Sequence, residues 1–296
     1  MFIKIDDEGQ VWAHPACLDL AAALIRQRGL TSLHVWTQGS RSEDGRVDLS
    51  LLSGVPSLRS LHIAGDISED RILNHEAIYG LTALTKLAPG ACPPLQLSSF
   101  PDLECLRIAG NRPHRGVGTL TKLRELTLYH LPDGDLSFLG GLAQLEVLGL
   151  VWTRGEVLEG LEAIANLTEL EISNSSDLVR INPLPPKLRD LNIQQCPKLT
   201  EFGFLAGNTS LEVFFVMTKV DSLAFVPSMT RLERLFITGV SDRDLSPLLA
   251  SESLRKISIR PFKKHYSHTK AELLSALGPD WRVDDVSLTR EPEADI

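Results

Sequence analysis

The sequence contains few cysteines, and none is spaced as a metal-binding or redox pair. Cys17, Cys92, Cys105 and Cys196 are scattered along the chain without a CxxC spacing. Disulfide frameworks and zinc ribbons use closely spaced cysteines, and disulfides persist in oxidising compartments. We therefore expect four free thiols in a reducing cytoplasm.

Long apolar runs are also absent. No stretch approaches the ~20 apolar residues that a membrane-spanning helix needs. Residues 1–16 lack the basic region and apolar core of a signal peptide. These absences predict a cytoplasmic protein with no membrane partner.

Positive charge is in deficit, with 30 lysines and arginines against 38 aspartates and glutamates. The formal net charge is −8 and the pI is about 5.5. A general nucleic-acid binder needs a basic surface, so we expect no nucleic acid as a partner. The balance is compatible with a basic protein partner, and equally with plain solubility.

What the chain does contain is a repeat. Leu123, Leu126 and Leu128 form an LxxLxL motif that returns 22 positions later. A fixed period of this size is typical of a solenoid, in which stacked units bury what one unit cannot. The motif begins at Leu30, Leu58, Leu84, Leu103, Leu123, Leu145, Leu167, Leu188, Leu211, Leu232 and Leu254.

The repeats are regular only in part. From Leu103 onward the spacing stays between 20 and 23 residues. Before Leu103 it is looser, and residues 38–47 and 65–80 look like insertions. The unit at Leu84 has Pro89 in place of its third apolar residue. Each motif predicts a short strand with leucines inward, all strands parallel, followed by a 3₁₀ or irregular return segment.

These motifs resemble the leucine-rich repeat family, and most closely its short internalin-like type. The resemblance implies an α/β solenoid, a curved horseshoe with a concave parallel β-sheet and short convex segments. The family's asparagine, which bonds turn backbone, is matched by Asn111. Elsewhere its position holds Asp66, Thr153, Ser175 or Cys196, which predicts an eroded asparagine ladder.

Both ends of the repeat array have sequences suited to caps. Residues 1–29 predict a hairpin and an amphipathic helix that begins near Pro15 and stops at Gly29. Residues 30–260 carry about 11 repeats. Residues 261–296 predict a helix over 270–277, a last strand with Trp281, Val283 and Val286, and a disordered tail over 291–296.

The resemblance also implies that the concave strand face binds the partner. The residues beside the inward leucines include His34, Trp36, His62 and Arg107 near the N-terminus. Farther along, aromatic and charged residues gather on this face, and they are the typical material of interface hot spots. The predicted partner-binding residues are Tyr129, His130, Trp152, Glu125, Glu169, Glu171, Asp190, Phe215, Met217, Phe236 and Arg234.

Each of these features has an alternative interpretation. The aromatic rings either contact a partner or cover neighbouring strands, and Phe215 and Phe236 in particular are placed to pack on each other. Glu169 and Glu171 share a strand face and form an acidic patch, because no pocket is predicted to make them an acid/base pair. Cys105 lies on the same face, and the sequence places no base to activate it.

The C-terminal loop offers two further candidates. His265 and His268 have no additional metal ligands nearby in the sequence, so a solvated loop is favoured over a metal site. The basic residues Arg260, Lys263, Lys264 and Lys270 suit either a solvated cap or contact with a phosphate or acidic partner. We predict no catalytic residue, no metal and no cofactor.

These observations favour a non-catalytic binding module for a protein partner. Single-domain acidic repeat proteins of this kind resemble bacterial interaction proteins, and an inhibitor or immunity-type protein that neutralises a toxin is one specific form. The alternative is a secreted bacterial effector or adaptor that acts through its repeats.

Overall fold

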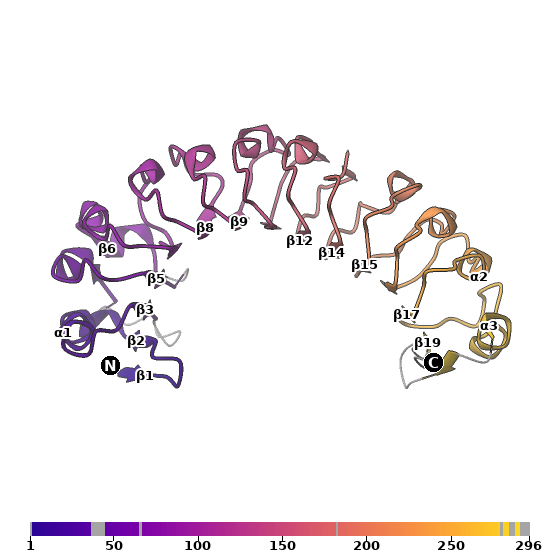
Figure 1. Cartoon of the computed structure of the whole chain (residues 1–296), viewed down its shortest axis with the longest axis horizontal. Coiled ribbons are helices and arrows are strands. Elements are labelled where there is room, and N and C mark those ends of the chain that lie inside the picture. Colours follow the sequence, from indigo (N-terminus) through magenta and orange to yellow (C-terminus); the bar gives the residue numbers. More distant parts are fainter. Residues whose placement is uncertain are drawn as a thin grey trace, which may run out of the picture. The chain divides into compact units, whose positions relative to one another are not determined.

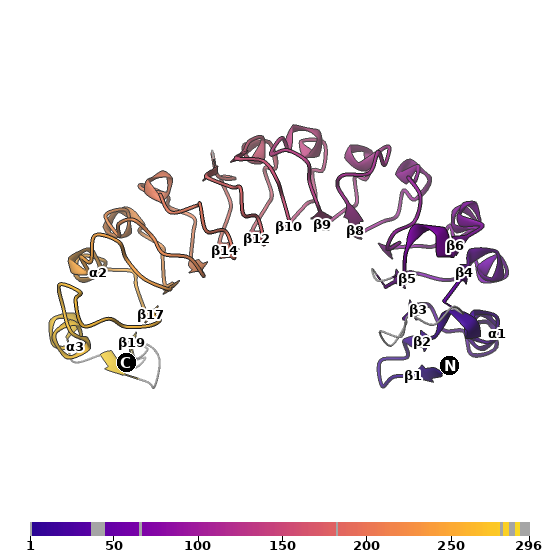
Figure 2. The ribbon, with the colours of Figure 1, turned by 180° about the vertical axis from the view of Figure 1, so that it is seen from behind.

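The computed structural model describes residues 2–36, 45–64, 67–181, 183–278, 281–283 and 288–290. The chain forms two compact units. The first comprises Met1–Tyr129 and Gly141–Leu145, and the second comprises His130–Gly140 and Glu146–Ile296. Within each unit, strands lie on one side of a stack of coils and short helices on the other (Figures 1 and 2).

The first unit opens with the predicted hairpin and helix. Strands β1 (Ile3–Ile5) and β2 (Val11–Ala13) pair antiparallel. A 3₁₀ turn, η1 (Pro15–Cys17), leads into α1 (Leu18–Arg28), which ends at Gly29 in the left-handed conformation. The helix ends at the expected glycine, but it begins at Leu18 rather than at Pro15, which starts the 3₁₀ turn instead.

Parallel strands follow β2 in the first unit. They are β3 (Ser32–Val35), β5 (Ser60–Ile63), β7 (Lys86–Ala88), β8 (Cys105–Ala109) and β9 (Glu125–Tyr129). Their middle leucines are in register from strand to strand, and the buried set is Leu33, Leu61, Leu87, Leu106 and Leu126. The LxxLxL motif therefore sets the pairing, because a slip by one residue would turn every leucine to the opposite face.

The weakened unit at Leu84 still contributes a strand. Pro89 is buried, so it fills the third apolar position, but β7 ends one residue before it. Gly90 follows with φ +60, and a β-carbon there would lie 2.8 Å from the carbonyl oxygen of Ile63. The proline shortens the strand, since it has no backbone N–H to donate, without interrupting the stack.

The two early insertions add a second, smaller sheet. Strands β4 (Val47–Asp48) and β6 (Ile72–Leu73) pair parallel. The 3₁₀ segments near them are η2 (Leu49–Leu52), η3 (Glu69–Arg71) and η4 (His75–Gly80). Residues 37–44, 65 and 66, which include most of the first predicted insertion, lie outside the described part of the chain.

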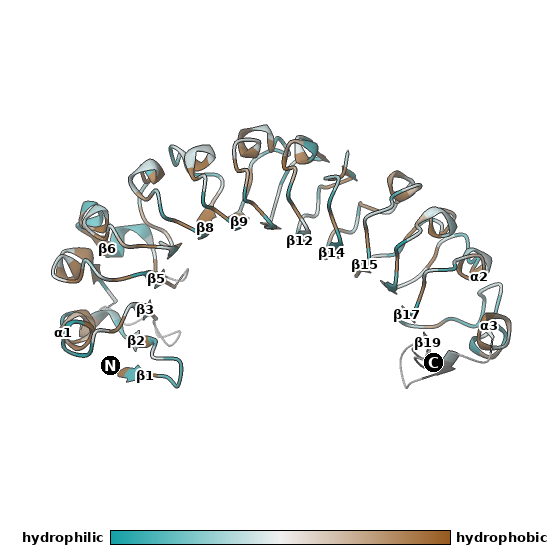
Figure 3. Cartoon of the chain, viewed as in Figure 1, coloured by the Kyte–Doolittle hydropathy of each residue, from teal (hydrophilic) through white to brown (hydrophobic). Residues whose placement is uncertain are grey.

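The second unit repeats the arrangement. Its parallel strands are β10 (Val147–Val151), β12 (Glu169–Ser173), β14 (Asp190–Gln194), β15 (Val213–Val216), β16 (Arg234–Ile237) and β17 (Lys256–Ile259). Register places Leu148, Leu170, Leu191, Phe214, Leu235 and Ile257 side by side, all buried. Figure 3 shows apolar residues recurring along the coils, with hydrophilic residues between them.

The return segments of both units are mostly single 3₁₀ turns, as predicted. They are η5 (Leu97–Ser99), η6 (Val117–Thr119), η7 (Ser137–Leu139), η8 (Leu161–Ala163), η9 (Gly203–Leu205) and η10 (Val226–Ser228). In the second unit α2 (Ser246–Leu249) is a short α-helix, and β11 (Val157–Leu158) pairs with β13 (Arg180–Ile181).

Hydroxyl and thiol groups occupy the turn position that the family fills with asparagine. Ser175 Oγ accepts a hydrogen bond from the Thr153 N–H at 3.1 Å and donates to the carbonyl of Ser173 at 3.2 Å. Cys196 Sγ donates to the carbonyl of Gln194 at 3.3 Å. In these repeats the loss of asparagine therefore does not remove side-chain bonding to the turn backbone.

One occupant of this turn position differs from the others in its burial. Asn111, which matched the family asparagine, is exposed rather than buried in a ladder. Asp66, another occupant of the position, lies outside the described residues.

After the last repeat, α3 (Lys270–Leu277) spans the predicted residues and begins with a capping box between Thr269 and Glu272. Strands β18 (Trp281–Val283) and β19 (Leu288–Arg290) pair antiparallel, and β19 also pairs antiparallel with β17. Val286 and the predicted tail over 291–296 are outside the described residues.

All four cysteines are free thiols, as expected. No helix among the described residues is both long enough and apolar enough to cross a bilayer.

Candidate functional site

The sheet face of the second unit consists of strand side chains that alternate with the buried leucines. On it, Glu169 in β12 is the register partner of Asp190 in β14, and Glu171 is the partner of Asn192. Glu169 and Glu171 are exposed, while Asp190 is partly buried. The structure thus brings three predicted carboxylates together on two adjacent strands, because paired residues of neighbouring strands share a face.

Asp190 is the partly buried carboxylate of this group. Burial raises the pKa of its carboxyl group above the usual value, and the guanidinium of Arg234 partly offsets this rise. Arg234 lies in the same row of side chains, since Asp190 pairs with Val213 and Val213 pairs with Arg234. Arg234 therefore marks the end of the acidic part of the face.

Strands β9, β10, β12 and β14 are each followed directly by a residue in the left-handed conformation. We call these residues the left-handed row: His130, Trp152, Asn174 and Gln195, with φ of 57°, 57°, 55° and 53°. The N–H of Trp152 donates to the carbonyl of Ser173, and the equivalent bond joins His130 to Val151. Residues other than glycine rarely adopt this conformation, so four in succession are a local feature that the fold enforces.

The left-handed row presents its side chains to solvent. The rings of His130 and Trp152 are stacked, with centroids 4.8 Å apart and planes 10° apart. Trp152 is 46% exposed. The stacked pair thus combines a contact between neighbouring coils with exposed ring surface.

The aromatic residues near β15 and β16 form a second group. Phe215 and Phe236 are register partners with ring centroids 5.7 Å apart, and both remain partly exposed. The expectation that they pack on each other is confirmed. Met217, which follows β15, is 50% exposed, and Arg234 is also exposed.

Two predicted residues belong to the first unit. Glu125 and Tyr129 both lie on β9, where Glu125 is exposed and Tyr129 is partly exposed. Glu125 is the register partner of Cys105. Burial and the neighbouring Glu125 carboxylate raise the pKa of the Cys105 thiol to about 11, so the thiolate is scarce near neutral pH.

Three stacked rings lie on the sheet face of the first unit, and the sequence did not predict them as partner-binding residues. Trp12 stacks on His34 and His34 stacks on His62, each at a centroid distance of 4.0 Å. Lys4 Nζ lies 5.1 Å from the Trp12 ring centroid, and the indole N–H donates to Asp6 at 2.7 Å. The recurrence of Ser-Leu-His in two successive repeats was the sequence feature that could have predicted the contact between His34 and His62.

Both imidazoles of this stack favour the neutral form. Burial, and then the neighbouring His62, lower the pKa of His34 to about 4. Burial, and then the charge of Arg107, lower the pKa of His62. The stack is therefore uncharged at neutral pH.

The C-terminal histidines do not gain a set of metal ligands. His268 Nδ1 lies 2.9 Å from Ser267 Oγ, and His265 packs near the ring of Tyr266. Within the described residues, no three side chains of histidine, cysteine, aspartate or glutamate are arranged to hold a metal ion.

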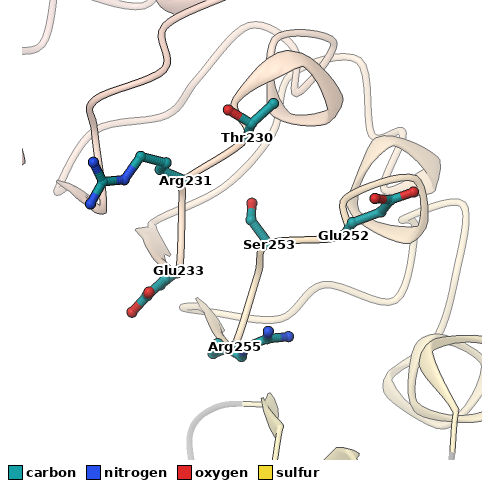
Figure 4. Close-up of a pocket in the computed structure, with 6 residues that line it drawn as sticks. All are labelled: Thr230, Arg231, Glu233, Glu252, Ser253 and Arg255. Carbon is teal, nitrogen blue, oxygen red and sulfur yellow. The ribbon is translucent and has the colours of Figure 1, made fainter.

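An open polar cavity of about 300 Å³ lies where β16 and β17 begin. Its lining residues are Thr230, Arg231, Glu233, Glu252, Ser253 and Arg255. Figure 4 shows that these side chains do not point to a common centre. Arg231 pairs with Glu212, and Ser253 Oγ donates to backbone carbonyls, so much of the lining is already engaged. None of the predicted partner-binding residues lines it.

Comparison with known proteins finds similarity in structure alone. No family model matches the sequence, and no curated protein matches it significantly. The TLR13 chain of a TLR13–ssRNA13 complex superposes with a TM-score of 0.55 at 15% identity, covering 88% of this chain and 47% of that one. This chain therefore spans about half the length of that match.

Two bacterial structures show weaker likeness. The leucine-rich repeat protein LIC12759 of Leptospira interrogans gives a TM-score of 0.49 at 18% identity, covering 87% of this chain and 61% of that one. An internalin (InlF) of Listeria monocytogenes gives 0.44 at 17% identity, covering 80% and 73%. The recurring LxxLxL motifs, the parallel strands that they form and the likeness to the TLR13 structure show that this chain has a leucine-rich repeat fold.

Proposed function

We propose that the chain is a binding module whose second unit holds a protein partner on its sheet face. The observation that carries this proposal is the arrangement of three carboxylates beside an exposed tryptophan. Glu169, Glu171 and Asp190 lie on paired strands, and Trp152 projects from the end of the strand beside them. A rigid sheet holds these groups in place without the entropic cost of ordering a loop.

The charge of this face points to a basic segment of the partner. Strands β10, β12 and β14 contain no lysine or arginine. A partner segment with lysine or arginine next to an apolar side chain would match the carboxylates and the indole together. Opposite charges would speed association, and burial of the Trp152 ring would contribute about 2 kcal/mol or more to the free energy of binding.

The aromatic group extends this surface toward the C-terminus. Phe215, Phe236 and Met217 offer apolar area, and Arg234 offers a positive charge beyond the acidic strands. A partner that spans both groups therefore needs an acidic or polar residue opposite Arg234. In the first unit, Glu125 and Tyr129 are the corresponding proposed contacts on β9.

We further propose that the chain inhibits its partner by covering a functional surface, as an inhibitor or immunity-type protein covers a functional surface of a toxin. The alternative is an effector or adaptor, which recruits its partner without blocking it. An assay of the captured partner's own activity separates the two. Stoichiometric loss of that activity supports the inhibitor, and retained activity supports the adaptor.

The test is affinity capture with matched baits, followed by measurement of affinity. Trp152→Ala should weaken binding by about thirtyfold or more, since about 2 kcal/mol is lost and 1.4 kcal/mol corresponds to a factor of ten. Phe138→Ala is the control, because Phe138 is 44% exposed but lies on the helical side of the second unit, in η7. Glu171→Lys should slow association more than it speeds dissociation.

Equal loss of the partner by the Trp152 and Phe138 variants would contradict the proposed surface. A sharp drop in melting temperature for Trp152→Ala alone would show instead that this ring is structural. Circular dichroism of each bait at the capture temperature distinguishes that outcome from a true loss of contact.

A further inference from the structure

Three consecutive loops of the second unit meet at Gly239. They follow β15, β16 and β17, and the third loop leads on to α3 (Figure 1). A methyl group placed on Gly239 would lie 3.1 Å from Tyr266 Oη, 3.8 Å from Lys219 Cγ and 4.0 Å from Lys263 Nζ. One residue without a side chain is thus surrounded by a hydroxyl and two lysine side chains from neighbouring repeats.

The hydroxyl of Tyr266 is buried and has no hydrogen-bond partner within the described structure. Tyr266 is only 7% exposed, and its ring packs edge-on against Phe262 at a centroid distance of 5.4 Å. Buried hydroxyl groups nearly always have a partner, because leaving a donor unsatisfied is unfavourable. The unused donor is directed at the space beside Gly239, next to Lys263 Nζ.

Positive charge converges on the same loops. The pKa of His265 is lowered by burial and by the charges of Arg243, Lys263 and Lys219, which places all three cations within electrostatic range of one imidazole. The carbonyl of Arg243 accepts a hydrogen bond from the Ser267 N–H at 2.9 Å, which ties two of these loops together.

These cations are not neutralised by ion pairs. In the part of the chain that the structure covers, no salt bridge joins Lys219, Arg243 or Lys263 to a carboxylate. Asp244 lies in the same loops, but its carboxylate accepts hydrogen bonds from Ser246 and Ser267. Asp221 and Asp242 also lie in these loops, and within the described residues no salt bridge joins either of them to these cations.

We propose that the loops around Gly239 form a binding site for a phosphate group, with Lys219, Lys263, Arg243 and His265 supplying charge and Tyr266 donating its hydroxyl hydrogen. A phosphate dianion suits this set, because its oxygens accept several charge-assisted hydrogen bonds at once. Gly239 has no side chain, so none stands between the hydroxyl and the two lysine side chains. This site would bind an anion, whereas the acidic face would bind a basic partner. The proposal therefore does not depend on the proposed function.

The basic residues after the last repeat were noted in the sequence as either a solvated cap or an anion contact. Lys219 and Arg243 belong to the two preceding repeats. The sequence does not show that they join this basic group, because their loops come together only when the repeats stack.

The experiment is isothermal titration of the whole chain with inorganic phosphate and, separately, with phosphoserine. Lys263→Gln should weaken binding about tenfold, and Tyr266→Phe about threefold or more, since each removes a charge-assisted contact. Lys264→Gln is the matched control, because it removes the same charge from the adjacent, exposed residue. It should change affinity less than twofold.

A second readout reports the site directly. Saturation with phosphate should raise the pKa of His265 in an NMR titration, because a bound anion favours the imidazolium form. Tighter binding of phosphoserine than of phosphate would support a phosphate ester as the ligand, and equal binding would support the free ion. Both outcomes uphold the site.

Two results would overturn the proposal. One is the absence of saturable binding by wild-type protein up to phosphate concentrations on the order of 10 mM, where even a weak site would be filled. The other is equal weakening by Lys263→Gln and Lys264→Gln, which would show a diffuse electrostatic effect. The melting temperatures of the variants serve as a control, because an unchanged value shows that a variant that does not bind is still folded.

Discussion

The histidine stack of the first unit makes the stability of the protein depend on pH. His34 has a pKa of about 4 in the folded chain, against 6.5 for an ordinary histidine. Below pH 6.5 the unfolded chain therefore binds a proton that the folded chain does not accept. The contribution of this residue to the free energy of unfolding is complete above pH 6.5 and is lost as the pH falls toward 4.

The size of the effect follows from the shift. At 1.36 kcal/mol for each pKa unit, a fall from 6.5 to about 4 corresponds to at most about 3 kcal/mol. His34 is partly exposed, so solvent screening reduces this figure, and we expect a loss of about 1 kcal/mol. Burial explains the sign, because it disfavours the charged imidazolium, and the neighbouring His62 adds to the fall in pKa.

The assay is urea denaturation of the wild type and of His34→Phe at pH values from 7.5 to 4. Phenylalanine retains a planar ring between Trp12 and His62 but does not titrate. Carboxylates also titrate in this range, so the informative quantity is the difference between the two proteins. We expect the wild type to lose about 1 kcal/mol more than the variant. Parallel stability curves would refute the assignment of a depressed pKa to the folded state.

Three other perturbations test the fold and the local chemistry. Leu170→Ala should lower the free energy of unfolding by about 3 kcal/mol, because it leaves a cavity in the stacked core; denaturant titration measures it. Ser175→Ala should cost about 1–2 kcal/mol in the same assay, since the buried N–H of Thr153 loses its acceptor. Glu125→Gln should increase the alkylation rate of Cys105 at pH 8, because it removes a charge that raises the thiol pKa; an unchanged rate would mean that burial alone controls it.

The leucine pattern was sufficient to predict the fold. Each LxxLxL motif carries two independent constraints, alternation along a strand and a fixed interval between strands, and both must be met for stacking. The helix over 270–277 was likewise predictable, since threonine and glutamate form its capping box and glycine follows it. These signals are local, so a sequence displays them directly.

Features that depend on neighbouring repeats were harder to predict. The stack of Trp12, His34 and His62 requires strands from three coils, and the phosphate site proposed at Gly239 requires three loops. The sequence places each residue on a face but does not show which ring lies against which. The sequence predicted the loss of asparagine from the turns but not the hydrogen bonds that the Ser175 hydroxyl makes there, because these join neighbouring repeats.

The left-handed row also bears on how recognition and stability are balanced in this protein. Each non-glycine residue in that conformation costs on the order of 1 kcal/mol relative to glycine. Replacing Trp152 with glycine should therefore relieve backbone strain while it removes the stack on His130 and the proposed anchor for the partner. The proposed anchor thus occupies a position where the backbone favours glycine, so the same residue affects both recognition and local strain.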